Sequence, residues 1–210
     1  MTHLVLIRHG ETEWNARGLY QGQLDSPLTD EGLAQAERMG ERMRHHSPIT
    51  ALYASDLART HATAAPTALA LGLEIVAEPD LGERGYGIFQ GIDKSAVQDK
   101  YPEEYTAHLT ANPDYVIPGG ESTRQFHTRV VAALDRLGQR HWGEQIAVGT
   151  HGGVLTAIFN HILGLAINAP RNFAIPNTGY NLVSNTGDGW RIETMGDISH
   201  LQDGALDDIA

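Results

Sequence analysis

Two short apolar runs in this chain each end in a polar residue followed by His-Gly. Residues 4–7 lead into Arg-His-Gly, with the histidine at His9, and residues 146–150 lead into His151. Short apolar runs bounded by polar residues are typical of strands buried in a sheet. Because ligands of α/β proteins bind at the carboxyl ends of strands, we expect His9 and His151 to reach one site.

Between these runs, strand patterns alternate with helix patterns. Thr29 is expected to cap one helix, Ser122 begins a capping box for another, and Pro66 predicts a kink or break in a third. The alternation predicts an α/β fold, a three-layer sandwich with a largely parallel central sheet flanked by helices. The predicted strands span residues 3–8, 49–54, 73–77 and 145–150, with a hairpin over 180–184 and 190–194, and the predicted helices span 29–47, 57–71, 122–137 and 154–163.

The length and composition indicate a single domain over residues 1–210. We expect an excursion at about 86–118 over the active site, because this stretch is interrupted by glycine and proline, and an acidic tail at about 197–210. There are no cysteines, which excludes disulfides and thiolate chemistry. The net charge of −11 and the lack of a basic cluster argue against a nucleic-acid partner.

Location and assembly are less constrained by the sequence. No signal peptide is visible, and no apolar run approaches the roughly 18 residues of a membrane span, so we expect a cytoplasmic protein without a membrane partner. The histidines lack metal-ligand spacing with nearby carboxylates, and we predict no metal. A homodimer is left open.

The residues around His9 suit the binding of an anion. Arg8 offers a planar fork that matches phosphate oxygens, and Gly10 is expected to let backbone N–H groups approach a ligand. Neighbouring cations are expected to hold His9 neutral, the form in which imidazole is a nucleophile. Glycines at the start of the helix after His151 would point further N–H groups at the same anion.

The string Arg-His-Gly-Glu-Thr-Glu-Trp-Asn resembles the histidine phosphatase superfamily, which contains the cofactor-dependent phosphoglycerate mutases and many phosphomonoesterases. The resemblance covers about residues 3–195. The matching elements are Arg8-His9-Gly10 with Asn15, Gln21-Gly22, Leu28-Thr29 before Gly32, Ser55-Asp56-Leu57 with Arg59-Thr60, Glu83, Gly119-Gly120-Glu121-Ser122 and His151-Gly152.

This resemblance implies a small phosphorylated metabolite as the substrate and a phosphohistidine intermediate on His9. It also implies that Arg59 binds the transferred phosphoryl group and that Glu83 is the general acid and base. We expect His151 to be a cationic hydrogen-bond donor to the phosphoryl oxygens. The remaining residues expected to bind substrate are Gly10, Asn15, Gln21, Gly22, Tyr86, Gly152 and Gly153.

Three functions are compared. A metal-independent phosphatase without a cofactor is favoured, because residues 91–119 contain no arginine and the mutases carry paired arginines for the substrate carboxylate in a long insertion. The same lack of arginine argues against a strict carboxylate requirement. A phosphoglycerate mutase, an isomerase that would need 2,3-bisphosphoglycerate, is the alternative, and the string from Glu83 to Gly87 leans toward it. A non-catalytic phosphoester-binding module would be expected to lack His9 or Glu83, and both are present.

Overall fold

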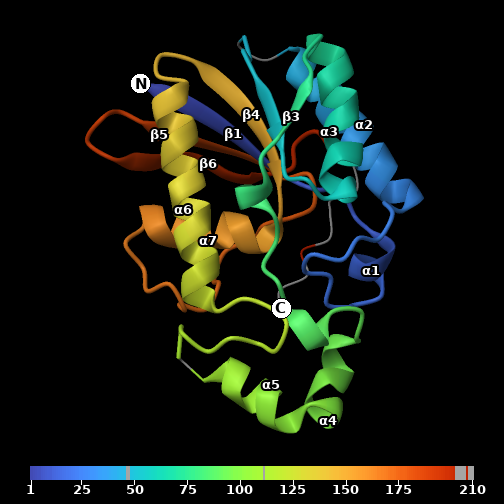
Figure 1. Ribbon diagram of the computed structural model, residues 1–210. Coiled ribbons are helices and arrows are strands. Elements are labelled where there is room, and N and C mark those ends of the chain that lie inside the picture. Colours follow the sequence, from blue (N-terminus) through green and yellow to red (C-terminus); the bar gives the residue numbers. More distant parts are fainter. Residues whose placement is uncertain (46–47, 111, 202–206, 208–210) are drawn as a thin grey trace.

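The computed structural model describes residues 1–45, 48–110, 112–201 and 207 (Figure 1). Its six-stranded sheet has the order β3-β2-β4-β1-β5-β6. The first four strands are parallel, and β5 and β6 continue the sheet as an antiparallel hairpin. The predicted α/β class with a largely parallel sheet is confirmed. The strands are β1 (Thr2–Arg8), β2 (Leu52–Ala54), β3 (Ile75–Ala77), β4 (Gln145–Thr150), β5 (Tyr180–Asn185) and β6 (Trp190–Asp197).

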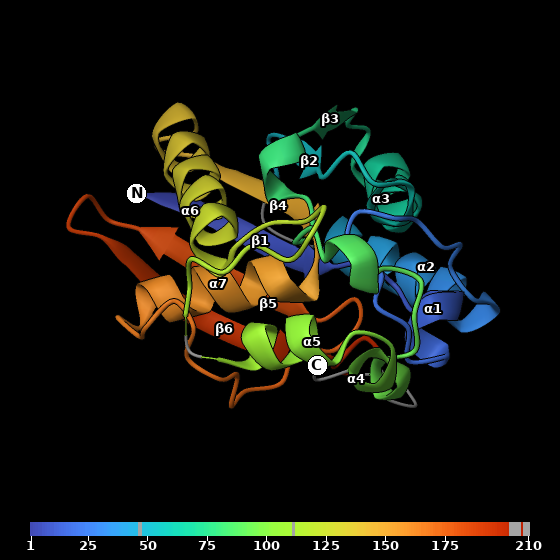
Figure 2. The same cartoon turned by 60° about the horizontal axis from the view of Figure 1, so that its bottom comes forward.

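Helices cover both faces of this sheet, as Figures 1 and 2 show. Successive side chains of β1 point to opposite faces of the sheet. Leu4 and Leu6 pack with α6 and α7 on one face, whereas Val5 and Ile7 pack with α2 and α3 on the other. The helices are α1 (Glu13–Ala16), α2 (Asp30–Arg44), α3 (Ala58–Leu71), α4 (Val97–Lys100), α5 (Pro102–Leu109), α6 (Thr123–Arg140) and α7 (Gly152–Ile162), with short 3-10 turns at Pro79–Leu81, Gly87–Phe89 and Lys94–Ala96.

The predicted helix caps are present. Thr29 Oγ1 accepts the backbone N–H of Gly32 at 3.0 Å, and Ser122 forms the capping box that begins α6. Of the kink or break predicted at Pro66, the break is wrong, because α3 runs through this residue as one helix. Pro66 packs there against α2, where a β-carbon added at Gly40 would lie 2.9 Å from the Pro66 side chain.

The excursion after β3 carries α4 and α5, which lie at the bottom of Figure 1. It has a small apolar core of its own, formed by Tyr20, Phe89, Val97 and Ile117. Because Tyr20 comes from the segment after α1, this core joins the excursion to the loop that follows His9.

The structure differs from the expected secondary structure near residue 15, and two other predicted segments lie outside the described residues. The stretch expected to be loop from residue 15 contains the end of the short helix α1, whose N-cap is Thr12. The expected helix end at Ser47 and most of the acidic tail lie outside the described residues. None of the helices in the described part of the chain is long and apolar enough to cross a membrane.

Candidate active site

The two histidines lie side by side at the carboxyl ends of β1 and β4. Arg8 and Thr150 are register partners in these strands, and the His9 N–H donates to the Thr150 carbonyl at 2.9 Å. The ring centroids of His9 and His151 are 5.2 Å apart. Parallel pairing of two strands that both end in histidine therefore brings the imidazoles together, as the sequence predicts.

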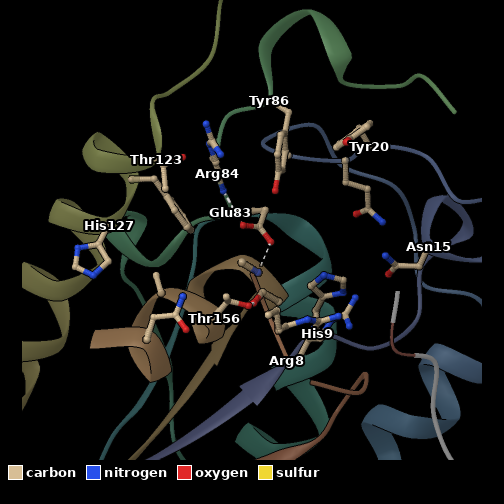
Figure 3. A pocket seen from close by; sticks show the side chains of 18 of the residues that line it. Arg8, His9, Asn15, Tyr20, Glu83, Arg84, Tyr86, Thr123, His127 and Thr156 are labelled. Carbon is tan, nitrogen blue, oxygen red and sulfur yellow. Dashed lines mark hydrogen bonds between the residues drawn. The ribbon is translucent and has the colours of Figure 1, made fainter. Parts of the chain in front are cut away.

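A pocket of about 240 Å³ opens beside His9. Figure 3 shows Arg8, His9 and Glu83 turned toward the same space. Most predicted site residues line this pocket, whereas Gly10 and His151 do not. The predicted residues in its wall are Arg8, His9, Asn15, Gln21, Gly22, Arg59, Glu83, Tyr86, Gly152 and Gly153.

The hydrogen bond made by His9 Nδ1 determines which ring nitrogen carries the lone pair. Its Nδ1 lies 2.8 Å from the Gly10 carbonyl oxygen. A carbonyl can only accept a hydrogen bond, so Nδ1 is the donor, and in the neutral ring the lone pair is then on Nε2. The Asn177 side chain donates to the His9 carbonyl at 2.9 Å and further fixes this residue.

Gly10 serves packing rather than the pocket wall. Its N–H donates to Thr63 Oγ1 at 2.9 Å, and an added β-carbon would lie 2.6 Å from the Gly32 carbonyl oxygen. The glycine thus permits close approach of another backbone segment instead of the expected approach of a ligand.

His151 lies beneath the pocket and is fully buried. Its Nε2 is 2.7 Å from Ser55 Oγ. Burial, followed by the charge of Arg59 and the proximity of His9, lowers the His151 pKa well below its usual value. This direction runs against the expected cationic form of His151, because burial disfavours the charged ring.

Arg59 is buried in the wall and holds the loop over residues 22–25. Its Nη1 donates to the Leu24 carbonyl and to Asp25 Oδ1, both at 2.8 Å, and its Nη2 donates to the Gly22 carbonyl at 2.7 Å. Burial lowers the Arg59 pKa, and the charges of Glu83 and Asp25 oppose that shift. Arg59 thus brings a guanidinium to the pocket and shapes its wall.

Asn15 and Gln21 are both held by Thr12. The Thr12 hydroxyl donates to Asn15 Oδ1 at 3.0 Å, and the Gln21 side-chain amide donates to the same hydroxyl. The turn of α1 therefore fixes two polar residues of the wall through one N-cap.

Glu83 is fixed by two backbone N–H groups. Its Oε1 accepts from Arg84 N at 2.7 Å, and its Oε2 accepts from Gly153 N at 3.0 Å. The Gly153 N–H belongs to the first turn of α7, so the helix that follows His151 also positions the carboxylate. The carboxylate and the His9 ring consequently face one cavity (Figure 3).

Arg129 of α6, which the sequence analysis did not identify, supports the loop that carries Glu83. We call the pair of Arg129 and Glu121 the brace. Arg129 donates to the carbonyls of Asp80 and Gly82, each at 2.8 Å, and to that of Glu83 at 2.9 Å. It also pairs with Glu121 at 2.8 Å. Burial raises the Glu121 pKa, but the hydrogen bonds from Arg129 and Gly85 outweigh it, and the pKa lies below its usual value.

Three further cations line the pocket: Arg84, Lys94 and Arg171. The sequence comparison of phosphatase and mutase considered arginines in residues 91–119 only, and both arginines lie outside that segment. Arg84 belongs to the string from Glu83 to Gly87 that favours a mutase, whereas Arg171 lies in a segment without a local pattern that would reveal it. Among the described residues, no group of three or more His, Cys, Asp or Glu is arranged to hold a metal.

Known proteins are similar to this chain in both sequence and fold. Residues 4–198 match the profile of the histidine phosphatase superfamily (branch 1). Phosphoglycerate mutase-like protein 4 of Arabidopsis thaliana is 39% identical over 203 residues, covering 95% of this chain and 87% of that protein. The metal-independent phosphoserine phosphatase of Arabidopsis thaliana is also 39% identical over 203 residues, covering 96% of this chain and 84% of that protein.

A solved structure agrees with these sequence relatives. The structure of Bacillus stearothermophilus YhfR superposes with a TM-score of 0.86 at 28% identity, covering 95% of this chain and 99% of that one. The match over most of the chain, on the fold that places His9 beside His151, leads to one conclusion: this protein is a member of branch 1 of the histidine phosphatase superfamily.

Proposed function

We propose that the chain hydrolyses small phosphomonoesters through a phosphohistidine on His9, with Glu83 as general acid and base. The observation that supports this most is the arrangement of the two residues. The Nδ1 contact with Gly10 leaves Nε2 as the reactive nitrogen, and the Glu83 carboxylate faces the same pocket. A nucleophile and a proton donor on one cavity are what a two-step displacement requires.

In the first step, His9 Nε2 attacks phosphorus and the bond to the ester oxygen breaks. Protonated Glu83 gives its proton to that oxygen, and the alcohol leaves. The general acid contributes roughly 10²–10⁴-fold to the rate. A phosphate beside Glu83 favours the protonated carboxyl, because two negative charges in proximity repel each other.

In the second step, water attacks the phosphohistidine while the Glu83 carboxylate takes its proton. The N–P bond breaks, releasing inorganic phosphate and neutral His9. Arg8 and Arg59 supply positive charge to the phosphoryl oxygens in both steps, so the proposed reaction needs no divalent ion. With its Nε2 at Ser55, His151 has Nδ1 left to donate to the same oxygens from beneath the pocket, and a bound dianion favours its protonation.

A phosphoglycerate mutase is the second candidate, in which a second alcohol instead of water receives the phosphoryl group. Two observations support the mutase. A relative that covers most of the chain is named phosphoglycerate mutase-like, and Arg84 and Arg171 bring guanidinium groups to the pocket. Such a mutase would require 2,3-bisphosphoglycerate.

A phosphate-release screen over small phosphomonoesters, with and without 2,3-bisphosphoglycerate, tests the proposal. We expect phosphate release without that cofactor and without added metal. Interconversion of 2- and 3-phosphoglycerate that exceeds phosphate release would instead show a mutase. Absence of both activities would favour a non-catalytic binding module.

A further inference from the structure

Ser55 is one of the residues on which the resemblance to the superfamily rests, yet the proposed reaction gives it no role. It directly follows β2 and is fully buried. Its Oγ lies 2.7 Å from Nε2 of His151 and 2.9 Å from Oγ1 of Thr60, which is in the first turn of α3. A single hydroxyl thus connects the second histidine of the site to the start of a helix.

The hydrogen of the Thr60 hydroxyl is already engaged. Thr60 Oγ1 donates to the carbonyl of Leu57, at 2.7 Å, and has the carbonyl of Ser55 as a second acceptor at 2.9 Å. A carbonyl oxygen can only accept a hydrogen bond, and a hydroxyl carries one hydrogen. Ser55 must therefore be the donor in its contact with Thr60.

The same count determines where His151 carries its proton. The Ser55 hydroxyl gives its one hydrogen to Thr60, so it accepts in its contact with His151, and Nε2 is the donor. In the neutral ring the lone pair is then on Nδ1. Nδ1 is buried and has no hydrogen-bond partner among the described residues, so it is the nitrogen left to interact with a bound phosphoryl group.

The charges around His151 determine when Nδ1 can carry a proton as well. The groups near the ring are Arg8 and His9 at the end of β1, Arg59 of α3 and Arg129 of α6, and the Glu83 carboxylate faces the adjoining pocket. Burial, followed by the surrounding positive charge, lowers the His151 pKa well below its usual value and keeps the resting ring neutral. A bound phosphate dianion offsets that positive charge and favours the protonated ring.

We propose that Ser55 is a positioning residue for His151: the hydroxyl chain of Thr60 and Ser55 keeps the proton of the neutral ring on Nε2, and Nδ1 takes up a proton from solvent when an oxyanion binds. The added proton forms the hydrogen bond to the phosphoryl group and returns to solvent when inorganic phosphate leaves. This inference rests on the proposed phosphatase reaction and gives Ser55 and Thr60 a part in it.

Nuclear magnetic resonance of the protein labelled with ¹⁵N in its histidines tests this tautomer without turnover. At about pH 7 the free protein should show His151 with a hydrogen on Nε2 and none on Nδ1. Sulfate stays a dianion at this pH, and its binding, followed through the His9 signals, should add a hydrogen to Nδ1 of His151. A hydrogen on Nδ1 in the free protein, or a His151 ring that stays neutral with sulfate bound, would overturn the inference.

Thr60→Val gives the sharpest prediction, because it removes the acceptor of the Ser55 hydrogen while keeping the shape of the side chain. The Ser55 hydroxyl should then donate to Nε2, and the proton of the neutral His151 ring should move to Nδ1. Thr67→Val is the matched control on the same helix, where the buried Thr67 Oγ1 has no hydrogen-bond partner in the described part of the chain. It should keep the wild-type tautomer. An unchanged tautomer in Thr60→Val contradicts the hydroxyl chain.

Ser55→Ala should lower kcat for p-nitrophenyl phosphate at least about tenfold, because the proton of His151 is no longer fixed. Ser184→Ala is the control: Ser184 is equally buried on β5, and its Oγ donates to Oε1 of Glu193 at 2.6 Å. It loses a buried hydrogen bond of the same kind and should keep the wild-type kcat. Equal kcat values for the two alanine variants count against the positioning role, and urea midpoints show that both variants fold.

The inference and the proposed function can fail separately. A His151 ring that behaves as expected, in a protein that releases no phosphate, supports the role of Ser55 and contradicts the phosphatase. Phosphate release by a protein whose free form carries the His151 hydrogen on Nδ1 contradicts the role of Ser55 alone.

Discussion

Glu83 and Gly153 are in such close contact that a side chain at position 153 would displace the carboxylate. The Gly153 N–H donates to Oε2 at 3.0 Å, and a β-carbon added to Gly153 would lie 2.2 Å from Oε1. The first turn of α7 therefore sets the position of the proposed general acid, although the two residues are far apart in the sequence.

Gly153→Ala should lower kcat by about tenfold to a hundredfold, because the displaced carboxylate no longer reaches the ester oxygen. Steady-state kinetics with p-nitrophenyl phosphate measure this loss. Gly149→Ala is the control in the preceding strand, where an added β-carbon would have its nearest neighbour at 3.6 Å. Equal kcat values for the two variants would show that the Glu83 contact does not position a catalytic group.

Arg129→Gln should destabilise the protein by about 1–3 kcal/mol, because it leaves Glu121 and the carbonyls of the Glu83 loop without their donor. Urea denaturation measures the free energy of unfolding. Arg129→Gln should also lower kcat, since the loop that carries Glu83 loses its support.

The brace can be separated from a general charge effect by two further variants. Glu121→Gln combined with Arg129→Gln should recover part of the lost stability, with a coupling energy of about 0.5–3 kcal/mol. Arg124→Gln, on the same helix but in an exposed pair with Asp114, should change stability by less than about 0.5 kcal/mol. Additive losses in the double variant would contradict the brace.

Folding stability should fall in mild acid, partly through His108. Burial, followed by the charge of Arg84, lowers the His108 pKa from 6.5 to about 4. Between these values the unfolded chain binds more protons, so this contribution to stability is present near neutral pH and is lost as the pH falls from about 6.5 toward 4. His108→Phe, which keeps an aromatic ring against Tyr86 and Phe89, should reduce the loss.

Urea midpoints at about pH 7 and about pH 5 measure this dependence. His45→Gln is the control, because the His45 side chain is 75% exposed. It should keep the wild-type pH dependence. The same pH dependence in His108→Phe as in the wild type would assign the effect to other groups.

Local patterns in the sequence were enough to predict the sheet and the meeting of the two histidines. Apolar runs marked β1 and β4, and their endings placed His9 and His151 at one edge once the strands paired in parallel. The caps at Thr29 and Ser122 were also predictable, because a side chain and the N–H groups it satisfies lie within one helical turn.

Features that depend on distant contacts were not predictable. The packing role of Gly10 depends on the Gly32 backbone, and the pKa of His151 depends on burial. Arg129 lies on a helix and Arg171 in a loop, and neither segment has a sequence pattern that distinguishes it from other helices or loops. Their positions at the site therefore could not be predicted. Pro66 leaves α3 continuous, although its intrinsic effect favours a break.

The central claim is that His9 carries the phosphoryl group during turnover. Rapid quenching of the wild-type protein with ³²P-labelled phosphomonoester should trap a labelled chain whose phosphate is labile in acid and stable in base, and peptide mapping should place the label on His9. His9→Ala should give no label and no turnover above background. Full phosphatase activity in His9→Ala, or a label on another residue, would contradict the account.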